Sequence, residues 1–220
     1  MIGFALCHGW AFNSNALQPL ANQLRQHFPH AAIALWDLGF TGRPHRPLLD
    51  RRYQWIAIGH SYGFAYLIQQ NMDWHAAISI NGFTRFCQHP GYCHGLSPRI
   101  LDNMIDHLCT DMLTTLSAFY ARCGLTPEQA IEHYQKNDFD RKNLIHHLKC
   151  MRDLNIPLPT YPLLALCSHH DKVVLPALTH ENFDRTLNIL RDVAGDHALP
   201  LKSSDICVYE IIQFVQSLAT

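Results

Sequence analysis

The residues with the most evident chemical potential form one short segment, Gly59–Gly63, which reads GHSYG. The apolar run Trp55–Ile58 before it predicts a buried strand, and Phe64–Gln70 after it predicts the start of a helix. A G-x-S-x-G segment between a strand and a helix is typical of a nucleophile elbow, a strained turn that exposes a serine hydroxyl. Both glycines are needed there because the crowded backbone leaves no room for a Cβ atom. We therefore expect Ser61 to be a nucleophile, and an ordinary glycine-rich turn is the alternative.

A serine hydroxyl needs a base to take its proton, and that base needs a carboxylate to orient it. After an elbow of this kind, the chain order is serine, then acid, then histidine. The predicted strand Leu163–Cys167 is followed by a loop with Asp171, and the predicted strand Leu187–Leu190 is followed by His197. The sequence therefore predicts Asp171 as the acid and His197 as the base.

Other interpretations of these two residues stay open. Asp171 could be a helix N-cap or an exposed carboxylate, and Asp192 and Asp196 are the alternative acids. His197 is one of sixteen histidines in the chain, so it carries little weight alone. The ordered set of serine, acid and histidine favours the catalytic interpretation.

The loop after the first predicted strand, Ile2–Cys7, supplies a further part of such a site. The negatively charged oxygen that forms during acyl transfer needs two N–H donors, one from the residue after the nucleophile and one from this loop. The loop reads His8-Gly9-Trp10. We expect the backbone N–H groups of Trp10 and Tyr62 to be the two donors, with Gly9 allowing the backbone to approach the substrate.

Metal binding is the other chemistry to consider, because sixteen histidines and eight cysteines could supply ligands. Cys87, His89, Cys93 and His94 lie close together in the sequence, but zinc sites usually combine tighter spacing with a second pair on another element. The pair His169-His170 lacks the further ligands of a dinuclear hydrolase loop. We predict neither a metal nor any other cofactor.

Composition excludes several classes of protein. The chain has 220 residues, 48% of them hydrophobic, which suits one core with an inserted subdomain. A formal net charge of −1 without a basic run excludes a nucleic-acid-binding footprint. No apolar run is long enough to span a bilayer. The eight cysteines form no C-x-x-C pair and no signal peptide is evident, so we expect a cytoplasmic protein. We also expect the protein to be a monomer.

Apolar runs alternate with helical patterns along most of the chain and predict a parallel sheet covered by helices on both faces. About six strands are expected, at Ile2–Cys7, Ala31–Trp36, Trp55–Ile58, Ala76–Ile80, Tyr161–Cys167 and Leu187–Leu190. Two helices of this layer are expected at Asn15–Phe28 and at the amphipathic segment Asp205–Leu218. The fold class is therefore α/β.

Residues 83–159 break this alternation, because they contain no convincing strand. Three helical patterns are found there instead, at Ile100–Cys123, Pro127–Gln135 and Asp140–Leu154. We expect this insertion to form a helical cap over the carboxyl ends of the strands, where open α/β sheets bind ligands. The expected division is a core of residues 1–82 and 160–220 with a cap of residues 83–159.

The chain resembles the α/β-hydrolases and, within them, the pimeloyl-[acyl-carrier protein] methyl ester esterases of biotin synthesis. Five segments carry this resemblance: LCHGWAFNSNAL (6–17), WDLGFTGRP (36–44), IGHSYG (58–63), PGYCHGLSPRILDNMIDHLCTDMLTTLSAFYARCG (90–124) and the stretch from HHDKVVLP to GDHALPLKSS (169–204). The H-G-W loop and the cap segment are the more specific parts. The resemblance implies an α/β-hydrolase fold in which Ser61, Asp171 and His197 form the catalytic triad.

The resemblance also assigns residues 119–123 of the cap to contacts with the acyl chain, namely Phe119, Tyr120, Ala121, Arg122 and Cys123. Two features depart from the family. The chain begins at the strand before the H-G-W loop, so the usual two antiparallel strands at the start of the sheet are expected to be missing. Thr114 and Ala118 stand where the family has arginines that touch the acidic carrier protein. Other basic residues of the cap could replace them: Arg122, Arg141, Lys142, Lys149 and Arg152.

The activity that the resemblance implies is cleavage of the methyl ester of a pimeloyl chain while it is attached to its acyl-carrier protein. The acyl ester would be the substrate and the carrier protein the partner, and the reaction would pass through an acyl-enzyme on Ser61. A carboxylesterase or thioesterase for other acyl substrates is the nearest alternative, since the fold hosts many chemistries. A non-catalytic binding protein on the same fold is the alternative from another class.

Overall fold

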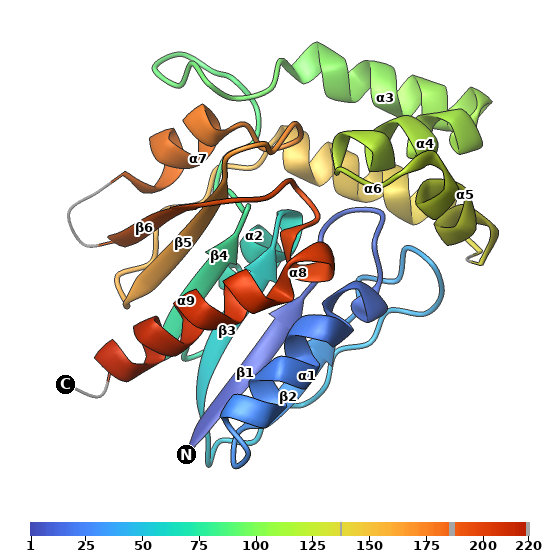
Figure 1. Ribbon diagram of the computed structural model, residues 1–220. Coiled ribbons are helices and arrows are strands. Elements are labelled where there is room, and N and C mark those ends of the chain that lie inside the picture. Colours follow the sequence, from blue (N-terminus) through green and yellow to red (C-terminus); the bar gives the residue numbers. More distant parts are fainter. Residues whose placement is uncertain (137, 185–187, 219–220) are drawn as a thin grey trace.

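The computed structural model describes residues 1–136, 138–184 and 188–218. At its centre is a six-stranded sheet in the order β2-β1-β3-β4-β5-β6, in which all neighbouring strands are parallel (Figure 1). The strands are β1 (Ile2–Cys7), β2 (Ala32–Trp36), β3 (Gln54–His60), β4 (Ala76–Ile80), β5 (Leu163–Ser168) and β6 (Asn188–Val193). The predicted parallel sheet is confirmed, and its first strand along the chain is β1, as expected. Leu187, the first residue of the last predicted strand, lies outside the described residues.

Helices cover both faces of this sheet (Figure 1). One face carries α1 (Gln18–His27) with the preceding 3-10 turn η1 (Ser14–Leu17), α8 (Leu199–Lys202) and α9 (Ser204–Ser217). The other face carries α2 (Tyr62–Ile68) and α7 (Pro176–Phe183), of which α7 was not predicted. The segment 15–28, expected to be one helix, begins with a 3-10 turn and becomes α-helical only at Gln18.

The strands are apolar on both sides because both faces of the sheet are buried. Successive side chains of a strand point to opposite faces, and β3 divides its residues accordingly. Trp55 and Ala57 join the cluster that includes α2 and the segment between β4 and β5, whereas Ile56 and Ile58 join the cluster with α1 and α9. Alternate residues of each continuous apolar run thus belong to two different hydrophobic clusters, one on each face of the sheet.

Four helices lie between β4 and β5 in the chain and above the carboxyl ends of the strands (Figure 1). They are α3 (Pro98–Thr110), α4 (Met112–Arg122), α5 (Pro127–Gln135) and α6 (Arg141–Arg152). The single helix predicted for Ile100–Cys123 is wrong, because the chain breaks at Asp111. This residue is extended at φ −142°, and its carboxylate caps α4 by accepting the N–H of Thr114 at 3.1 Å.

These four helices, which we call the cap, are joined to the rest of the chain by hydrogen bonds. The Tyr120 hydroxyl of α4 donates to the backbone oxygen of Ala11. The N–H of Asp140, at the start of α6, donates to the backbone oxygen of Phe40 at 2.8 Å. The cap therefore lies fixed on the carboxyl ends of the strands, and its separation as a subdomain of residues 83–159 stays a prediction.

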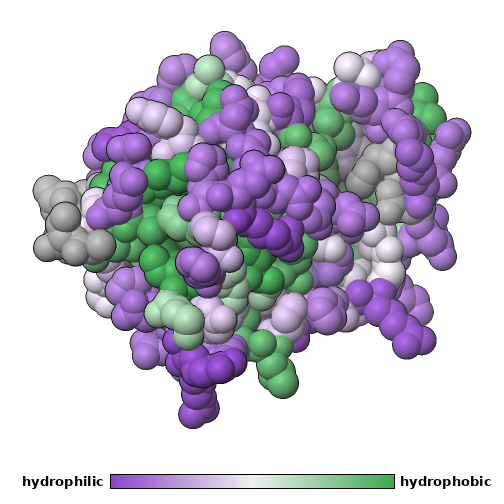
Figure 2. Space-filling view, turned by 60° about the horizontal axis from the view of Figure 1, so that its bottom comes forward, coloured by the Kyte–Doolittle hydropathy of each residue, from purple (hydrophilic) through white to green (hydrophobic). Residues whose placement is uncertain are grey.

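Figure 2 shows the face that includes the amino ends of the strands. Hydrophobic residues gather in the left half of this face, and hydrophilic residues surround them. Within the residues that the structure describes, no helix has both the length and the apolar character that crossing a membrane requires.

Replacing Gly63 by alanine should destabilise the fold, because the added Cβ would overlap the backbone oxygens of Cys7 and His8. Backbone atoms can shift less than side chains to relieve such an overlap. We therefore expect the free energy of unfolding to fall by about 3 kcal/mol, the upper end of the usual cost of overpacking a core. Urea unfolding measures this loss. Gly91→Ala is the comparison, since its Cβ would meet nothing within 4 Å and only its φ of +81° is unfavourable. That strain costs about 1 kcal/mol, and equal losses in the two variants would contradict the packing explanation.

Candidate active site

Ser61 occupies a strained turn between β3 and α2. Its φ of +53° and ψ of −127° are rare for a residue with a side chain. The turn is held because Ser61 N–H donates to Ile80 O at 2.9 Å and Ser61 O accepts the N–H of Phe64 at 3.1 Å. A Cβ atom at Gly59 would overlap α2, and one at Gly63 would overlap the loop after β1. The segment thus has the geometry expected of a nucleophile elbow.

Asp171 and His197 form a buried hydrogen-bonded pair. Nδ1 of His197 lies 2.7 Å from Oδ2 of Asp171, and both side chains are only 1% exposed. The other carboxylate oxygen of Asp171 accepts the N–H groups of Val173 and Val174 at 2.7 and 2.8 Å. Because an ionised carboxylate only accepts hydrogen bonds, Nδ1 of His197 carries the proton and Nε2 has a free lone pair. This Nε2 is buried and has no hydrogen-bond partner among the described residues.

Asn81 links the loops that carry Asp171 and His197, the predicted acid and base, and sequence reasoning missed this role. Its Nδ2 group donates to the Ser168 hydroxyl at 2.9 Å and to the backbone oxygens of Asp196 and His197 at 3.0 and 3.2 Å. Its Oδ1 accepts the N–H of Ser168 at 2.9 Å. Asn81 follows β4 with a φ of +50°, a conformation that asparagine tolerates. The only sequence signal for it was an asparagine directly after a predicted strand.

His60, the residue before the serine, was also missed as a site residue. Its Nε2 donates to the backbone oxygen of His197 at 2.8 Å, and the two imidazole rings lie 4.9 Å apart. Burial, together with the nearby His197, lowers the pKa of His60 well below its ordinary value. His60 therefore stays neutral and supports the backbone of the predicted base.

The two predicted oxyanion donors have free N–H groups. Neither Trp10 N–H nor Tyr62 N–H has a hydrogen-bond acceptor within the described residues. A Cβ at Gly9 would lie 3.0 Å from Cβ of Ser61, so the loop passes very close to the elbow. Ala11, with a φ of +59°, turns the backbone after Trp10. The arrangement can present both donors to an oxygen bound next to Ser61.

The side chains of the same two residues reach the cap. The indole Nε1 of Trp10 donates to the backbone oxygen of Leu144 at 3.0 Å. The Tyr62 hydroxyl lies 2.9 Å from Nδ1 of His147 on α6. The side chains of both predicted oxyanion donors are thus hydrogen-bonded to the cap. The cap therefore helps to hold the backbone that carries the two N–H groups.

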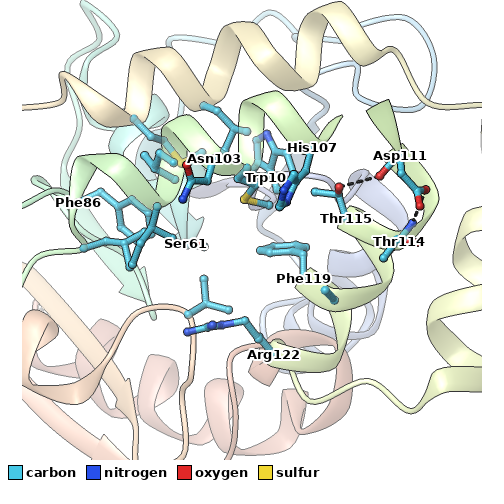
Figure 3. A pocket seen from close by; sticks show the side chains of 18 of the residues that line it. Trp10, Ser61, Phe86, Asn103, His107, Asp111, Thr114, Thr115, Phe119 and Arg122 are labelled. Carbon is cyan, nitrogen blue, oxygen red and sulfur yellow. Dashed lines mark hydrogen bonds between the residues drawn. The ribbon is translucent and has the colours of Figure 1, made fainter. Parts of the chain in front are cut away.

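A cavity of about 560 Å³ connects Ser61 with the cap. Figure 3 shows Ser61 and Phe86 on one side of this cavity, Asp111 and Thr114 on the other, and Phe119 between them. Most of its wall is apolar, from residues Trp10, Phe83, Phe86, Leu96, Ile100, Leu101, Met104, Ala118, Phe119, Leu148, Met151 and Val173. Polar side chains are contributed mainly by α3 and α4, namely Asn103, His107, Thr110, Asp111, Thr114, Thr115 and Arg122. Such a space fits an aliphatic chain with a few polar groups.

No protein-family model matches the chain, and no curated protein matches its sequence. Solved structures do resemble it. An esterase (EaEST) from Exiguobacterium antarcticum has a TM-score of 0.81 at 18% identity, over 98% of this chain and 92% of that one. The enol-lactonase from Burkholderia xenovorans LB400 gives 0.78 at 12% identity, over 98% and 92%. BioG from Haemophilus influenzae gives 0.62 at 20% identity, over 90% and 89%. The chain has the α/β-hydrolase fold.

In this α/β-hydrolase fold, the predicted acyl-chain residues of α4 divide into two groups. Phe119 and Arg122 line the cavity. Tyr120 and Cys123 are fully buried away from it, and Ala121 is exposed outside the cavity wall. The helical period explains this division, because adjacent residues of a helix cannot all face one cavity. Of the five residues expected to contact an acyl chain, Phe119 and Arg122 thus line the cavity, and an acyl contact of any of the five stays a prediction.

Cys123 and Arg122, at the end of α4, connect the cap to the loops that carry His197 and Asp171. The backbone oxygen of Cys123 accepts the N–H of Ala198, next to His197, at 3.0 Å. The Arg122 guanidinium donates to the backbone oxygen of Lys172 at 3.0 and 3.2 Å. Burial raises the pKa of the Cys123 thiol well above its ordinary value, so this cysteine is not a nucleophile at neutral pH.

The basic residues considered for a carrier-protein contact have different surroundings. Arg152 is paired with Asp102 and Asp153 at 2.8 and 3.2 Å. Lys142 and Lys149 are exposed on α6. Arg141 is also exposed and donates to the backbone oxygen of Cys109 at 3.4 Å. Thr114 and Ala118 line the cavity.

The metal ligands considered from the sequence do not assemble into a site. Cys87 is buried, Cys93 is exposed, and the N–H groups of Cys93 and His94 donate to the carboxylate of Glu181 at 3.0 and 2.9 Å. Across the described ranges, a single group of three His, Cys, Asp or Glu side chains offers ligand atoms within 4.8 Å of one another, and it lies elsewhere.

The free energy of unfolding should fall as the pH drops from about 6.5 toward 4. Burial lowers the pKa of His147 to about 4 and that of His60 well below 6.5. Below about pH 6.5 the unfolded chain binds protons that these folded histidines do not, so acid favours unfolding. Urea unfolding midpoints at pH 7.5 and 5 measure this dependence.

The variant His147→Gln removes one of these two histidines and should show a smaller difference between the two midpoints. His30→Gln, which removes an exposed histidine, is the matched control and should retain the difference. Equal midpoints at both pH values in the unmodified protein would contradict this interpretation.

Proposed function

We propose that the protein is a serine carboxylesterase that works through an acyl-enzyme on Ser61. One set of observations carries this proposal: a strained serine lines the cavity, and the residue before it, His60, contacts His197 of a buried Asp171–His197 pair whose Nε2 is free. The tilted contact between the His60 and His197 rings, whose centroids are 4.9 Å apart, supports the proposed proximity of serine and base, because His60 directly precedes the serine. Esterases are among the solved structures with the same fold, which supports this class of reaction.

In the first half of the reaction, Ser61 Oγ bonds to the ester carbonyl carbon while Nε2 of His197 takes the hydroxyl proton. The carbonyl oxygen becomes negative and accepts the N–H groups of Trp10 and Tyr62. The ester C–O bond then breaks, and the alcohol leaves with the proton that His197 returns. In the second half, water gives a proton to His197, attacks the acyl-enzyme and releases the acid, after which Ser61 regains its proton.

Asp171 acts through His197 in this scheme. It accepts a hydrogen bond from Nδ1–H of His197, which leaves the Nε2 lone pair available for the serine proton, and its charge stabilises the imidazolium that forms during attack. The N–H groups of Val173 and Val174 fix the carboxylate in the required orientation. Because the pair is buried, water does not compete for these hydrogen bonds.

For the substrate, we propose the methyl ester of a pimeloyl chain on its acyl-carrier protein. The sequence resemblance of the H-G-W loop and the cap supports this choice. The apolar cavity of about 560 Å³ beside Ser61 supports it as well, since it accepts an aliphatic chain. Lys142 and Lys149 are the proposed contacts to the acidic carrier, because residues seven apart share one face of α6 and both are exposed.

Ser61→Ala should abolish hydrolysis of a short chromogenic ester, and Asp171→Asn should lower kcat by about 10³–10⁴-fold because His197 takes the wrong tautomer. Asp196→Asn is the matched control, since it changes a neighbouring carboxylate that pairs with Lys202 instead. It should retain activity within a few-fold. Circular dichroism checks that each variant is folded. Turnover by folded Ser61→Ala would overturn the proposal.

Methyl pimeloyl-carrier protein should be hydrolysed with a higher kcat/KM than the matching thioester or a short acetate. The double variant Lys142→Glu, Lys149→Glu should raise KM for the carrier-bound ester by about tenfold through charge repulsion. Its KM for free monomethyl pimelate should not change. Equal kcat/KM for all esters would leave a general esterase and contradict the proposed substrate.

A further inference from the structure

Three side chains with metal-binding chemistry meet outside the cavity. They are Cys167 of β5, His180 of α7 and Asp192 of β6, and their ligand atoms all lie within 4.8 Å of one another. Nε2 of His180 lies 2.9 Å from Oδ1 of Asp192. The cysteine is buried, whereas the histidine and aspartate side chains are 42% and 45% exposed. The cluster is thus a shallow surface site with a thiol at its base.

The donor set of this cluster fits a particular kind of ion. One sulfur, one imidazole nitrogen and one carboxylate oxygen are a combination that Zn²⁺ binds in tetrahedral geometry, and hard cations such as Ca²⁺ or Mg²⁺ prefer oxygen alone. The half-exposed histidine and aspartate leave the fourth position open to water. Each ligand comes from a different element, so ligation would connect β5, β6 and α7.

A second observation points to a ligand at the same place. The hydroxyl of Thr179, which precedes His180, is 1% exposed and has no hydrogen-bond partner among the described residues. This hydroxyl lies beside the Cys167 sulfur. A buried hydroxyl without a partner is costly, and a thiolate held by a cation would give it an acceptor.

The cluster has a carboxylate without a permanently charged partner. Asp192 pairs with His180, and no arginine or lysine among the described residues forms an ion pair with it. Arg191 does not reach the cluster, because it lies on the opposite face of β6 and pairs with Glu210 at 3.7 Å. A divalent cation would bind the carboxylate together with a Cys167 thiolate.

We propose that Cys167, His180 and Asp192 bind one Zn²⁺ ion, with the Cys167 proton released to solvent on binding. The site would have a structural role, since Cys167 precedes the loop of Asp171 and Asp192 precedes the loop of His197. Cross-linking β5 and β6 at this point would stabilise the spacing of those two loops. This inference does not depend on the esterase proposal.

Cobalt substitution tests the site directly. Metal-free protein titrated with Co²⁺ should develop one equivalent of a thiolate-to-cobalt absorption band, which none of the sixteen histidines can produce alone. Cys167→Ser should lose the band, and His180→Ala should weaken Co²⁺ binding at least tenfold. Cys207→Ser, which changes a buried cysteine on α9, is the matched control and should keep the band. Zn²⁺ at about 100 times its Kd should raise Tm by roughly 5–10 °C in the unmodified protein but not in His180→Ala.

Absence of the band in the unmodified protein, or its persistence in Cys167→Ser, would overturn the proposal. Should Cys167→Ser fail to fold, His180→Ala decides, because its side chain is partly exposed and its removal leaves the core intact. Unchanged Co²⁺ affinity and an unchanged Zn²⁺ effect on Tm in His180→Ala would show adventitious binding by other histidines.

Discussion

Close packing of backbone on backbone holds Ser61 in its strained conformation, and the other parts of the site depend on this contact. A residue at positive φ costs about 1–3 kcal/mol unless its surroundings fix it. Here, β3 lies between β1 and β4, and the absence of a side chain at Gly59 and Gly63 lets α2 begin directly above it. Gly63 also lies against the loop after β1, so the same contact sets the position of Trp10 relative to the serine.

The parallel sheet brings the remaining groups to the same edge. The loops after β1, β3, β5 and β6 carry Trp10, Ser61, Asp171 and His197, the proposed oxyanion donor, nucleophile, acid and base, and all four loops lie at the carboxyl ends of their strands. Asn81, after β4, joins two of these loops by hydrogen bonds. The cap holds two of these loops by hydrogen bonds. Its Leu144 accepts the indole N–H of Trp10, and its Arg122 donates to the loop that carries Asp171. Its apolar inner wall leaves space for an acyl chain beside the serine.

The sheet and the elbow could be predicted from the sequence because local rules determine them: strands buried on both faces are continuously apolar, and the elbow requires two glycines at fixed spacing. The break at Asp111 was missed because an N-cap inside a long helical pattern is a weak signal. The roles of His60 and Asn81 could not be predicted, because they depend on contacts with residues more than eighty positions away. The same limit applies to Cys167, His180 and Asp192, which have no motif spacing and meet only in the folded chain.

The central claim is that Ser61 is an activated nucleophile, and labelling with a fluorophosphonate tests it most directly. This reagent modifies a serine only where a base takes the hydroxyl proton and donors stabilise the phosphoryl oxygen. Peptide mass spectrometry of the folded protein should find one adduct, on the peptide that contains Ser61, with labelling slowed strongly in Asp171→Asn. A folded protein that remains unlabelled, or that is labelled at another residue, would contradict the account and favour a binding protein without catalysis.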